Sequence, residues 1–453
     1  MKPSTECAEE FYKYLRRRGI SKKNVFRKLD SWDFREILDF VLEAYLTLRM
    51  RPEETESIFT FTANSGLSGA PFPCESIICR LNKLDSVARF AALYADKVFI
   101  ENPFERYLSS ESVYDPTTKT TMLAGDILGL LYLRPLFQAG LLSIRHNINL
   151  LCSNCLAEVE ALEQKVSKQL DRARKQLQKR YLREVQVHIL KEDDEVFLRY
   201  TGPEHLIEHG ILDLIGPLQL PQSLREKCSS IGAHKLTRRE IAEYDLTSWF
   251  VYAIVKDIFQ QNIHVCRHGT QYLTDREIDL DIATSIGKPD VVKTSRSLLA
   301  GLSHSIPTIE NIHLDKLIHL RQKEGEAFEV YRDALHRVLN QAQALEPDEM
   351  RVLIDDEIRP EIHKIERTIT TTKRLLVNSL KRDVLVSAGY VAIGLFSGFL
   401  SPKAADIAIA LGGHSGVKSI AEKIPQLRRD PAKVLENPYY FLWKLQKKTK
   451  KQW

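Results

Sequence analysis

The amino-acid sequence predicts a helix-dominated α+β protein. We expect an N-terminal mixed α/β unit with a small sheet, then a long antiparallel helical hairpin, then short apolar helices that contain glycine. Apolar residues recur at helical spacing along much of the chain, and short apolar runs that follow some of these helices read as strands. A coiled-coil-like pattern begins near residue 314. With 453 residues and 43% hydrophobic residues, the chain is long enough for two or three structural units.

Charge and cysteine content narrow the class of protein. The 65 basic and 60 acidic residues nearly balance, which argues against the strongly basic surface of a dedicated nucleic-acid binder. Seven cysteines, an odd number, fit reduced thiols better than a disulfide framework. The first 18 residues mix acidic and basic side chains and lack the apolar core of a secretory signal. We therefore expect a cytoplasmic protein.

Residues 1–72 are expected to form an N-terminal helical segment. Apolar residues recur at helical spacing from 11 to 48, and a loop rich in Gly, Ser and Pro follows at 64–73. This loop contains Ser65-Gly66-Leu67-Ser68-Gly69, which is one residue short of the G-x-S-x-G motif of a serine nucleophile. We interpret it as a loop without that chemistry.

Residues 73–305 are expected to form the mixed α/β unit, in which helices outnumber strands. The helix from 124 to 140 should kink at Pro135 and end at Gly140. The predicted helices are 81–95, 124–140, 156–181 and 248–260, and the predicted strands are 98–100, 141–144, 196–200 and 262–266.

The last third of the chain changes character. Residues 306–383 carry apolar positions on an alternating three-four frame, which predicts two long helices packed antiparallel. Residues 384–453 are expected to form an apolar helical hairpin followed by an aromatic and basic tail. The apolar run 384–400 is shorter than a membrane-spanning helix, so we expect it to be buried. The alternative is conditional membrane contact through 384–413, with nearby lysines attracted to anionic lipid.

Two cysteine pairs suggest a structural zinc site. Cys152 and Cys155 have the spacing at which two thiolates bind one tetrahedral ion. Cys74 and Cys79, or His146, are the candidates for the remaining two ligands. The alternative is that these are ordinary buried thiols, because free cysteine packs as a small hydrophobic residue.

A second motif suggests catalytic zinc. His205, Glu208 and His209 match H-x-x-E-H, in which two histidines bind zinc and the glutamate acts as general base on water. Pro203 and Gly210 limit the expected helix to about two turns. The alternative is a short solvated helix with its histidines near the negative C-terminal end.

A third group depends on a strand at 262–266. His264, Cys266 and His268 would then share one face, and Asp275, Asp279 and Asp281 follow closely, as in a carboxylate-rich metal or nuclease-like centre. The alternative, which we prefer, is a strand that leaves the core and is followed by a solvated acidic turn.

The leading functional hypothesis is a non-catalytic interaction protein, a sensor or effector that acts in a complex with a protein partner or with itself. By analogy only, such a chain suits a prokaryotic defence or stress system, antiviral defence included. One alternative is a zinc-dependent hydrolase that uses His205, Glu208 and His209. Another is a nucleic-acid-associated protein that binds through the lysines of 444–451.

Overall fold

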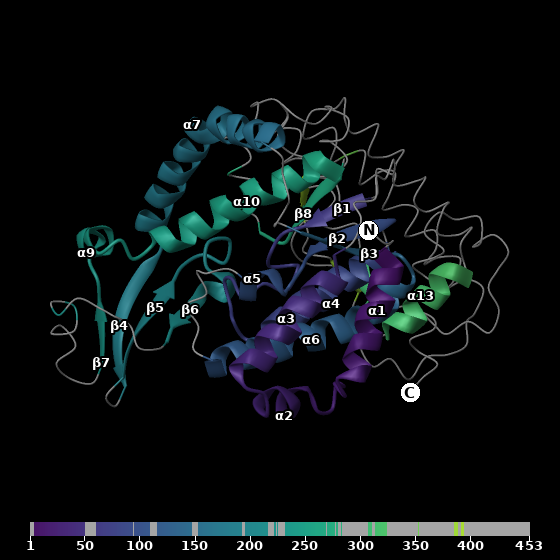
Figure 1. Cartoon of the computed structure of the whole chain (residues 1–453). Coiled ribbons are helices and arrows are strands. Elements are labelled where there is room, and N and C mark those ends of the chain that lie inside the picture. The colour runs from purple at the N-terminus through teal and green to yellow at the C-terminus, as the bar shows by residue number, and fades with distance from the viewer. Residues whose placement is uncertain are drawn as a thin grey trace, which may run out of the picture.

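A computed structural model describes most of the first 276 residues and a few later segments (Figure 1). The described residues are 4–49, 60–93, 95–108, 116–146, 153–192, 195–215, 222, 224, 232–268, 270–276, 278–279, 282, 307–309, 313–323, 352, 385–387 and 391–393.

A mostly parallel sheet forms the centre of the molecule. Its strand order is β11-β8-β1-β2-β3, with β1, β2, β3 and β8 parallel and β11 antiparallel to β8. The strands are β1 (Thr60–Ala63), β2 (Lys97–Glu101), β3 (Leu142–Arg145), β8 (Gln271–Thr274) and β11 (Val391–Ile393). The inner strands β1 and β2 read as near-continuous buried runs, as expected for a parallel sheet that helices cover on both faces.

Helices connect these strands. The crossover from β1 to β2 is α4 (Ile77–Leu93), and the crossover from β2 to β3 contains α5 (Glu105–Leu108) and α6 (Pro116–Gln138). The N-terminal α1 (Ser4–Arg17), α2 (Val25–Asp30) and α3 (Phe34–Thr47) pack outside them, with contacts of α1 and α2 to α6. In Figure 1, α10 (Ser248–His268) lies on the other side of the strands from α4 and α6. Right-handed crossovers place helices on opposite faces of a sheet when the chain changes direction along it, as it does here after β3.

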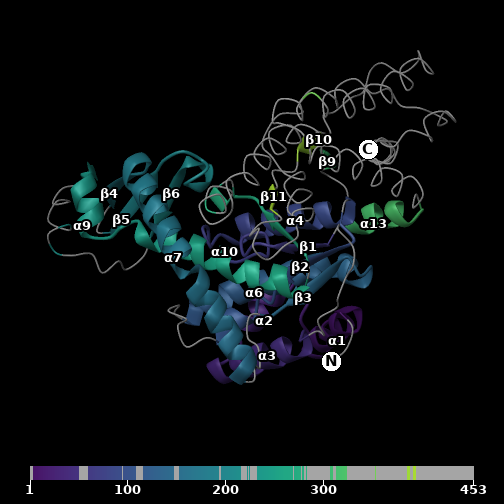
Figure 2. The same ribbon diagram turned by 90° about the horizontal axis from the view of Figure 1, so that it is seen from above.

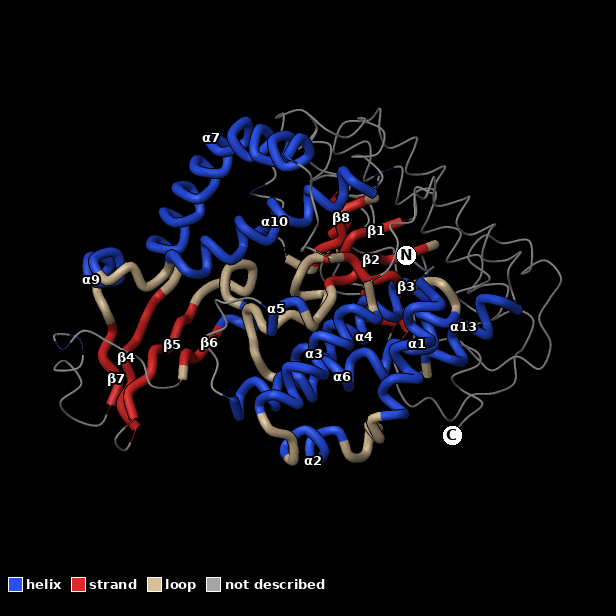
Figure 3. Tube along the Cα trace, in the orientation of Figure 1, coloured by secondary structure: helices blue, strands red, loops and turns tan. Residues whose placement is uncertain are grey.

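An antiparallel sheet is inserted between β3 and β8. Its strand order is β6-β5-β4-β7, and it stands apart from the parallel sheet in Figures 2 and 3. The strands are β4 (Gln186–Glu192), β5 (Glu195–Thr201), β6 (Ile211–Leu214) and β7 (Gly232–Lys235). The long helix α7 (Ser153–Glu184) leads into it, and α9 (Arg238–Glu243) leads out, beginning at the capping box of Thr237 and Glu240. Helix α10 then runs from this sheet back to the parallel one.

The structure is thus a helix-rich α/β fold with a parallel four-stranded and an antiparallel four-stranded sheet. The predicted strands at 98–100, 141–144 and 196–200 are confirmed as parts of β2, β3 and β5. The helices predicted at 156–181 and 248–260 lie within α7 and α10, and α6 contains Pro135. The strand predicted at 262–266 is wrong, because α10 continues through it. Strand β1 was not predicted.

The C-terminal predictions are tested at a few residues only. Helix α13 (Leu314–Lys323) begins where the hairpin was expected and packs on α4. The rest of 306–383 lies outside the described residues, apart from short segments. Within the predicted apolar helices, β10 (Leu385–Ser387) pairs with β9 (Pro307–Ile309), and β11 pairs with β8. These six residues therefore form strands and not helices, because their backbone groups pair with those of β9 and β8. Among the described residues, no helix is long and apolar enough to cross a membrane.

Candidate functional site

The strand order creates a natural binding position between β1 and β8. From β1 the chain steps to β2 and then β3 in one direction, whereas β8 lies on the other side of β1. The connections that leave the carboxyl ends of β1 and β8 therefore diverge. In open α/β sheets, ligands bind in the crevice outside such a switch point.

Asn64, the first residue after β1, fixes both sides of this crevice. Its amide donates to Thr274 Oγ1 at 2.7 Å and to Asp275 Oδ1 at 3.0 Å, which ties the end of β1 to the end of β8. Its side-chain oxygen accepts the backbone N–H of Leu67 at 2.7 Å and so shapes the loop that follows β1. Asn64 is fully buried, so these bonds satisfy an amide that would be costly to leave unpaired.

Lys83 forms an ion-pair centre at the same place. Its Nζ lies 3.1 Å from Asp275 Oδ2 and 3.0 Å from Glu208 Oε1, and the Lys83 side chain is only 14% exposed. Burial alone lowers the pKa of Lys83, but the two carboxylates outweigh it and the net shift is upward. Burial raises the pKa of Asp275, whereas Lys83 and Asn64 lower it to a net value below normal. The pair is therefore charged at neutral pH.

Arg276 organises the carboxylates behind this centre. It lies 2.5 Å from Asp257 Oδ2 on α10 and 3.0 Å from Asp279 Oδ2. Thr274 and Tyr272 also donate to Asp279, at 2.6 and 2.8 Å. Burial raises the pKa of Asp279 despite the nearby guanidinium, and the carboxylates around Arg276 raise its pKa well above normal against the effect of burial. Asp279 Oδ1 is buried and has no hydrogen-bond partner in the described structure.

The polar network continues along the carboxyl edge of the sheet. Gln261 donates to Asp257 at 2.6 Å and to Glu101 at 3.0 Å, and Arg145 donates to Glu101 at 3.0 Å. Beyond it, His146 Nδ1 lies 3.4 Å from Asn102 Nδ2 and 3.6 Å from Glu105 Oε1.

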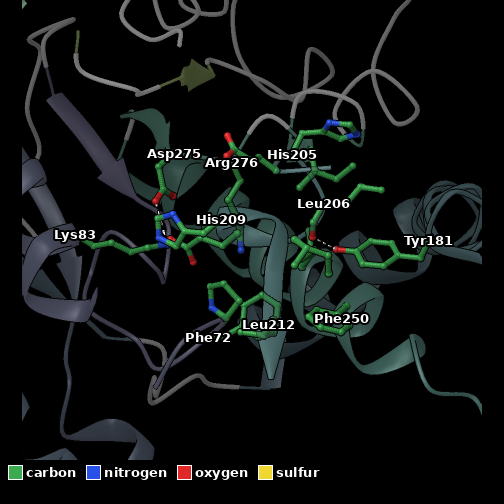
Figure 4. Close-up of a pocket in the computed structure, with 16 residues that line it drawn as sticks. Phe72, Lys83, Tyr181, His205, Leu206, His209, Leu212, Phe250, Asp275 and Arg276 are labelled. Atoms are coloured by element: carbon green, nitrogen blue, oxygen red, sulfur yellow. Dashed lines mark hydrogen bonds and ion pairs between the residues drawn. The ribbon is translucent and has the colours of Figure 1, made fainter. Parts of the chain in front are cut away.

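A cavity of about 300 Å³ opens beside Lys83 (Figure 4). Its walls come from five parts of the chain: α4 and the loop before it, α7, the 204–212 segment of the antiparallel sheet, α10, and the residues after β8. Polar groups occupy one side of the cavity in Figure 4 and aromatic rings the other. The residues used below are Phe72, Lys83, Tyr181, Glu208, Leu212, Phe250, Asp275 and Arg276.

Half of the predicted structural zinc site falls within the described residues. Cys152 and the side chain of Cys155 lie outside the described residues. Cys74 and Cys79 are half-buried free thiols, before and within α4. Burial is the main cause that raises the pKa of Cys74, and the neighbouring Cys79 thiol adds to it.

The H-x-x-E-H residues lie at the cavity, but the helix expected for them is wrong. Residues 204–207 form turns and Glu208–Gly210 forms a 3-10 turn, in which His209 has a φ of 59°. His205 Nε2 lies 2.7 Å from Arg180 Nη2, a donor that occupies one of the two ring nitrogens through which a histidine binds a metal. Glu208 binds Lys83. No three His, Cys, Asp or Glu side chains form a candidate metal site within the described part of the chain.

The residues of the third predicted group do not share one strand face, because α10 continues through residues 262–266. His264 is buried on α10, whereas Asp275 and Asp279 belong to the switch-point network rather than to a solvated turn. The sequence interpretation did not assign Asn64, Lys83 or Arg276 to any site. The available signal was the loop of small residues at 64–70, which follows β1 directly.

Comparisons of the chain with protein-family models, with curated proteins and with solved structures find no match. The functional argument therefore depends on the geometry of the site.

Proposed function

We propose that this chain is a sensor or effector that binds a small nucleotide-like ligand in the switch-point cavity and acts in a complex. The observation that carries the proposal is the position of the cavity, at the carboxyl ends of β1 and β8 where the strand order reverses. Doubly wound sheets bind nucleotides at this point. The cavity volume of about 300 Å³ falls at the lower end of the range for small-molecule sites.

The chemistry of the walls supports this ligand class. Tyr181 and Phe250 form a buried aromatic wall, and the half-buried ring of Phe72 offers apolar surface to a base. The charges of Lys83 and Arg276 are balanced by the carboxylates that they pair with, so the polar side of the cavity suits a ligand of low net charge that has hydrogen-bonding groups, such as a nucleoside. Glu208 Oε2 is a buried acceptor without a hydrogen-bond partner among the described residues, and a ribose hydroxyl is a donor of suitable size.

The cavity also suggests how binding is communicated. Lys83 belongs to α4 beside the parallel sheet, and Glu208 belongs to the connection between β5 and β6. A ligand in this cavity therefore contacts both sheets, and its binding favours one arrangement of the two. A partner that contacts both sheets would respond to the ligand, as a sensor or effector requires.

Calorimetric titration of the full chain with adenosine, AMP, ATP and NAD tests the proposal. We expect saturable binding by at least one of them, and loss of that binding in Leu212→Trp, which enlarges a cavity-lining side chain. Leu214→Trp is the matched control, because Leu214 lies on the same face of β6 outside the cavity lining. Absence of binding by every probe to the wild-type chain would refute the nucleotide class.

The other functional hypotheses stay predictions. A role in prokaryotic defence or stress and a location in the cytoplasm depend on analogy and composition. Nucleic-acid contact through 444–451 falls outside the described residues, as does most of 384–413, where membrane contact was considered. The zinc-hydrolase interpretation is not favoured by the contacts of His205 and Glu208.

A further inference from the structure

Helix α3 carries a row of large apolar side chains on its exposed surface. Phe34 is 64% exposed, Leu38 43%, Leu42 46% and Leu46 54%. These residues are spaced by four, so they form one continuous ridge along the helix. Figures 1 and 2 show α3 at the outside of the molecule.

The ridge is not needed to attach α3 to the rest of the chain. The adjoining side of the helix does this with the buried residues Phe40, Val41, Ala44 and Tyr45. The N-terminus of α3 is fixed by the capping box of Asp33 and Glu36. A surface helix normally has one apolar face and one polar face, so a second apolar ridge points to a second packing partner.

We propose that this ridge is an interface between two copies of this chain, with two α3 helices packed antiparallel about a two-fold axis. Ridges of residues spaced by four interdigitate with their equivalents in the commonest class of helix packing. In the antiparallel pair, Phe34 of one copy lies near Leu46 of the other, and Leu38 lies near Leu42, so each copy presents the same patch.

Charge favours this orientation over the parallel one. The row of residues next to the ridge carries Arg35, Asp39 and Glu43, all exposed. Antiparallel packing brings Arg35 of each copy within about two residues of Glu43 of the other, which allows two ion pairs, although it also places the two copies of Asp39 near each other. Parallel packing would place each of the three residues beside its own copy, with like charges at every position. Glu43 also lies 3.9 Å from Arg18, but its side chain is 53% exposed and accessible to a second cation.

The exposed area is consistent with a reversible dimer. The four side chains expose roughly 400 Å² per copy if a large side chain carries about 200 Å². With the polar rim added, two copies bury on the order of 1,000 Å², which is the size of a weak, transient interface. The inference names a partner for the complex in which the proposed sensor acts. It does not depend on the ligand, because the cavity lies elsewhere and is tested by calorimetry.

Sedimentation equilibrium of the full chain over a wide range of concentration tests the interface. We expect a monomer–dimer equilibrium whose Kd rises roughly tenfold or more in Leu42→Glu, because a carboxylate cannot be buried there without a partner. Ile78→Glu is the matched control, since Ile78 is a 72% exposed apolar residue of α4 outside the ridge. A wild-type chain that stays monomeric, or equal effects of the two substitutions, would overturn the proposal.

A charge exchange tests the orientation. Arg35→Glu and Glu43→Arg should each weaken the dimer, because each places like charges across the interface. The double substitution should restore it, because the pairs form again with opposite polarity. A double variant that is as weak as the sum of the two single variants would exclude antiparallel packing of α3.

Discussion

Replacement of Asn64 by alanine should loosen the junction of β1 and β8 more than any surface change of the same kind. The substitution removes hydrogen bonds to Thr274, Asp275 and the N–H of Leu67. Thr274 and Asp275 keep other partners, whereas the Leu67 N–H loses the acceptor that Asn64 Oδ1 provided. A buried orphan donor costs about 1–3 kcal/mol and each lost hydrogen bond about 1 kcal/mol, so we expect a loss of roughly 3 kcal/mol.

Asn24 provides the control for this substitution. Its side chain also makes three hydrogen bonds, accepting from the N–H and Oγ of Ser21 and donating to the carbonyl of Gly19, but at an exposed site. Water replaces these partners in Asn24→Ala, so we expect a loss of about 1 kcal/mol or less.

Hydrogen exchange followed by mass spectrometry measures the difference where it should occur. Amides of β1 and β8 should exchange roughly 100-fold faster in Asn64→Ala, as a loss of about 3 kcal/mol in opening free energy predicts. Exchange in Asn24→Ala should stay close to that of the wild type in these strands. Equal exchange rates of β1 and β8 in the two variants would show that the buried hydrogen bonds of Asn64 do not stabilise the junction of these strands.

Two further predictions concern the same region. Gly69→Ala should cost about 3 kcal/mol in a denaturation experiment, because Gly69 has a φ of +82° and an added Cβ would lie 2.9 Å from Leu84. Gly19→Ala, with a φ of +69° and open space around it, should cost about 1 kcal/mol, and equal costs would contradict the steric argument. Lys83→Met should destabilise the chain at neutral pH, by an amount that falls as the pH drops through the pKa of Asp275. The folded-state pKa of Asp275 is lowered, so its stabilising effect is present above its unfolded pKa of about 3.9 and is lost in acid. Denaturation midpoints of both proteins from neutral to acid pH measure this, and a difference independent of pH would contradict it.

The sequence predicts the elements of this fold better than their assembly. Strands β2 and β3 are apolar runs that end in turn residues, and they were predicted on that basis. Strand β1, Thr60–Ala63, contains only four residues with little to distinguish them from the adjoining loop. Its identity depends on pairing with β8, whose residues follow about 210 positions later, and local pattern carries no information about such pairing.

The C-terminal end of α10 shows a different limit. His264, Cys266 and His268 alternate as on a strand, yet the helix continues because Ile254, Ile258, Gln261 and Val265 form one buried row at helical spacing. Gln261 is the polar member of this row, so the sequence does not show an apolar pattern at helical spacing there. Its side-chain amide donates to Asp257 and Glu101 in the network behind the site. The role of Gln261 in the site is thus the reason that the C-terminal end of α10 was not predicted from the sequence.

The candidate site was likewise predicted in pieces. Glu208 and Asp275 were singled out, but for metal chemistry with other partners. Their shared partner Lys83 is an ordinary lysine in sequence, and only the fold brings a residue of α4 between two segments that lie far along the chain.

The distance in sequence between β1 and β8 also matters while the protein is being made. Asn64 and Thr274 are 210 residues apart, and the buried hydroxyls of Thr62 and Thr270 are 208 apart. At roughly 5–20 residues per second, a ribosome needs tens of seconds to supply β8 after β1 has emerged. Throughout that interval the β1 edge that later pairs with β8 presents open backbone groups, a template for pairing with other chains. Nascent chains, and products of premature termination before residue 271, should therefore be the forms of this protein that depend most on chaperones.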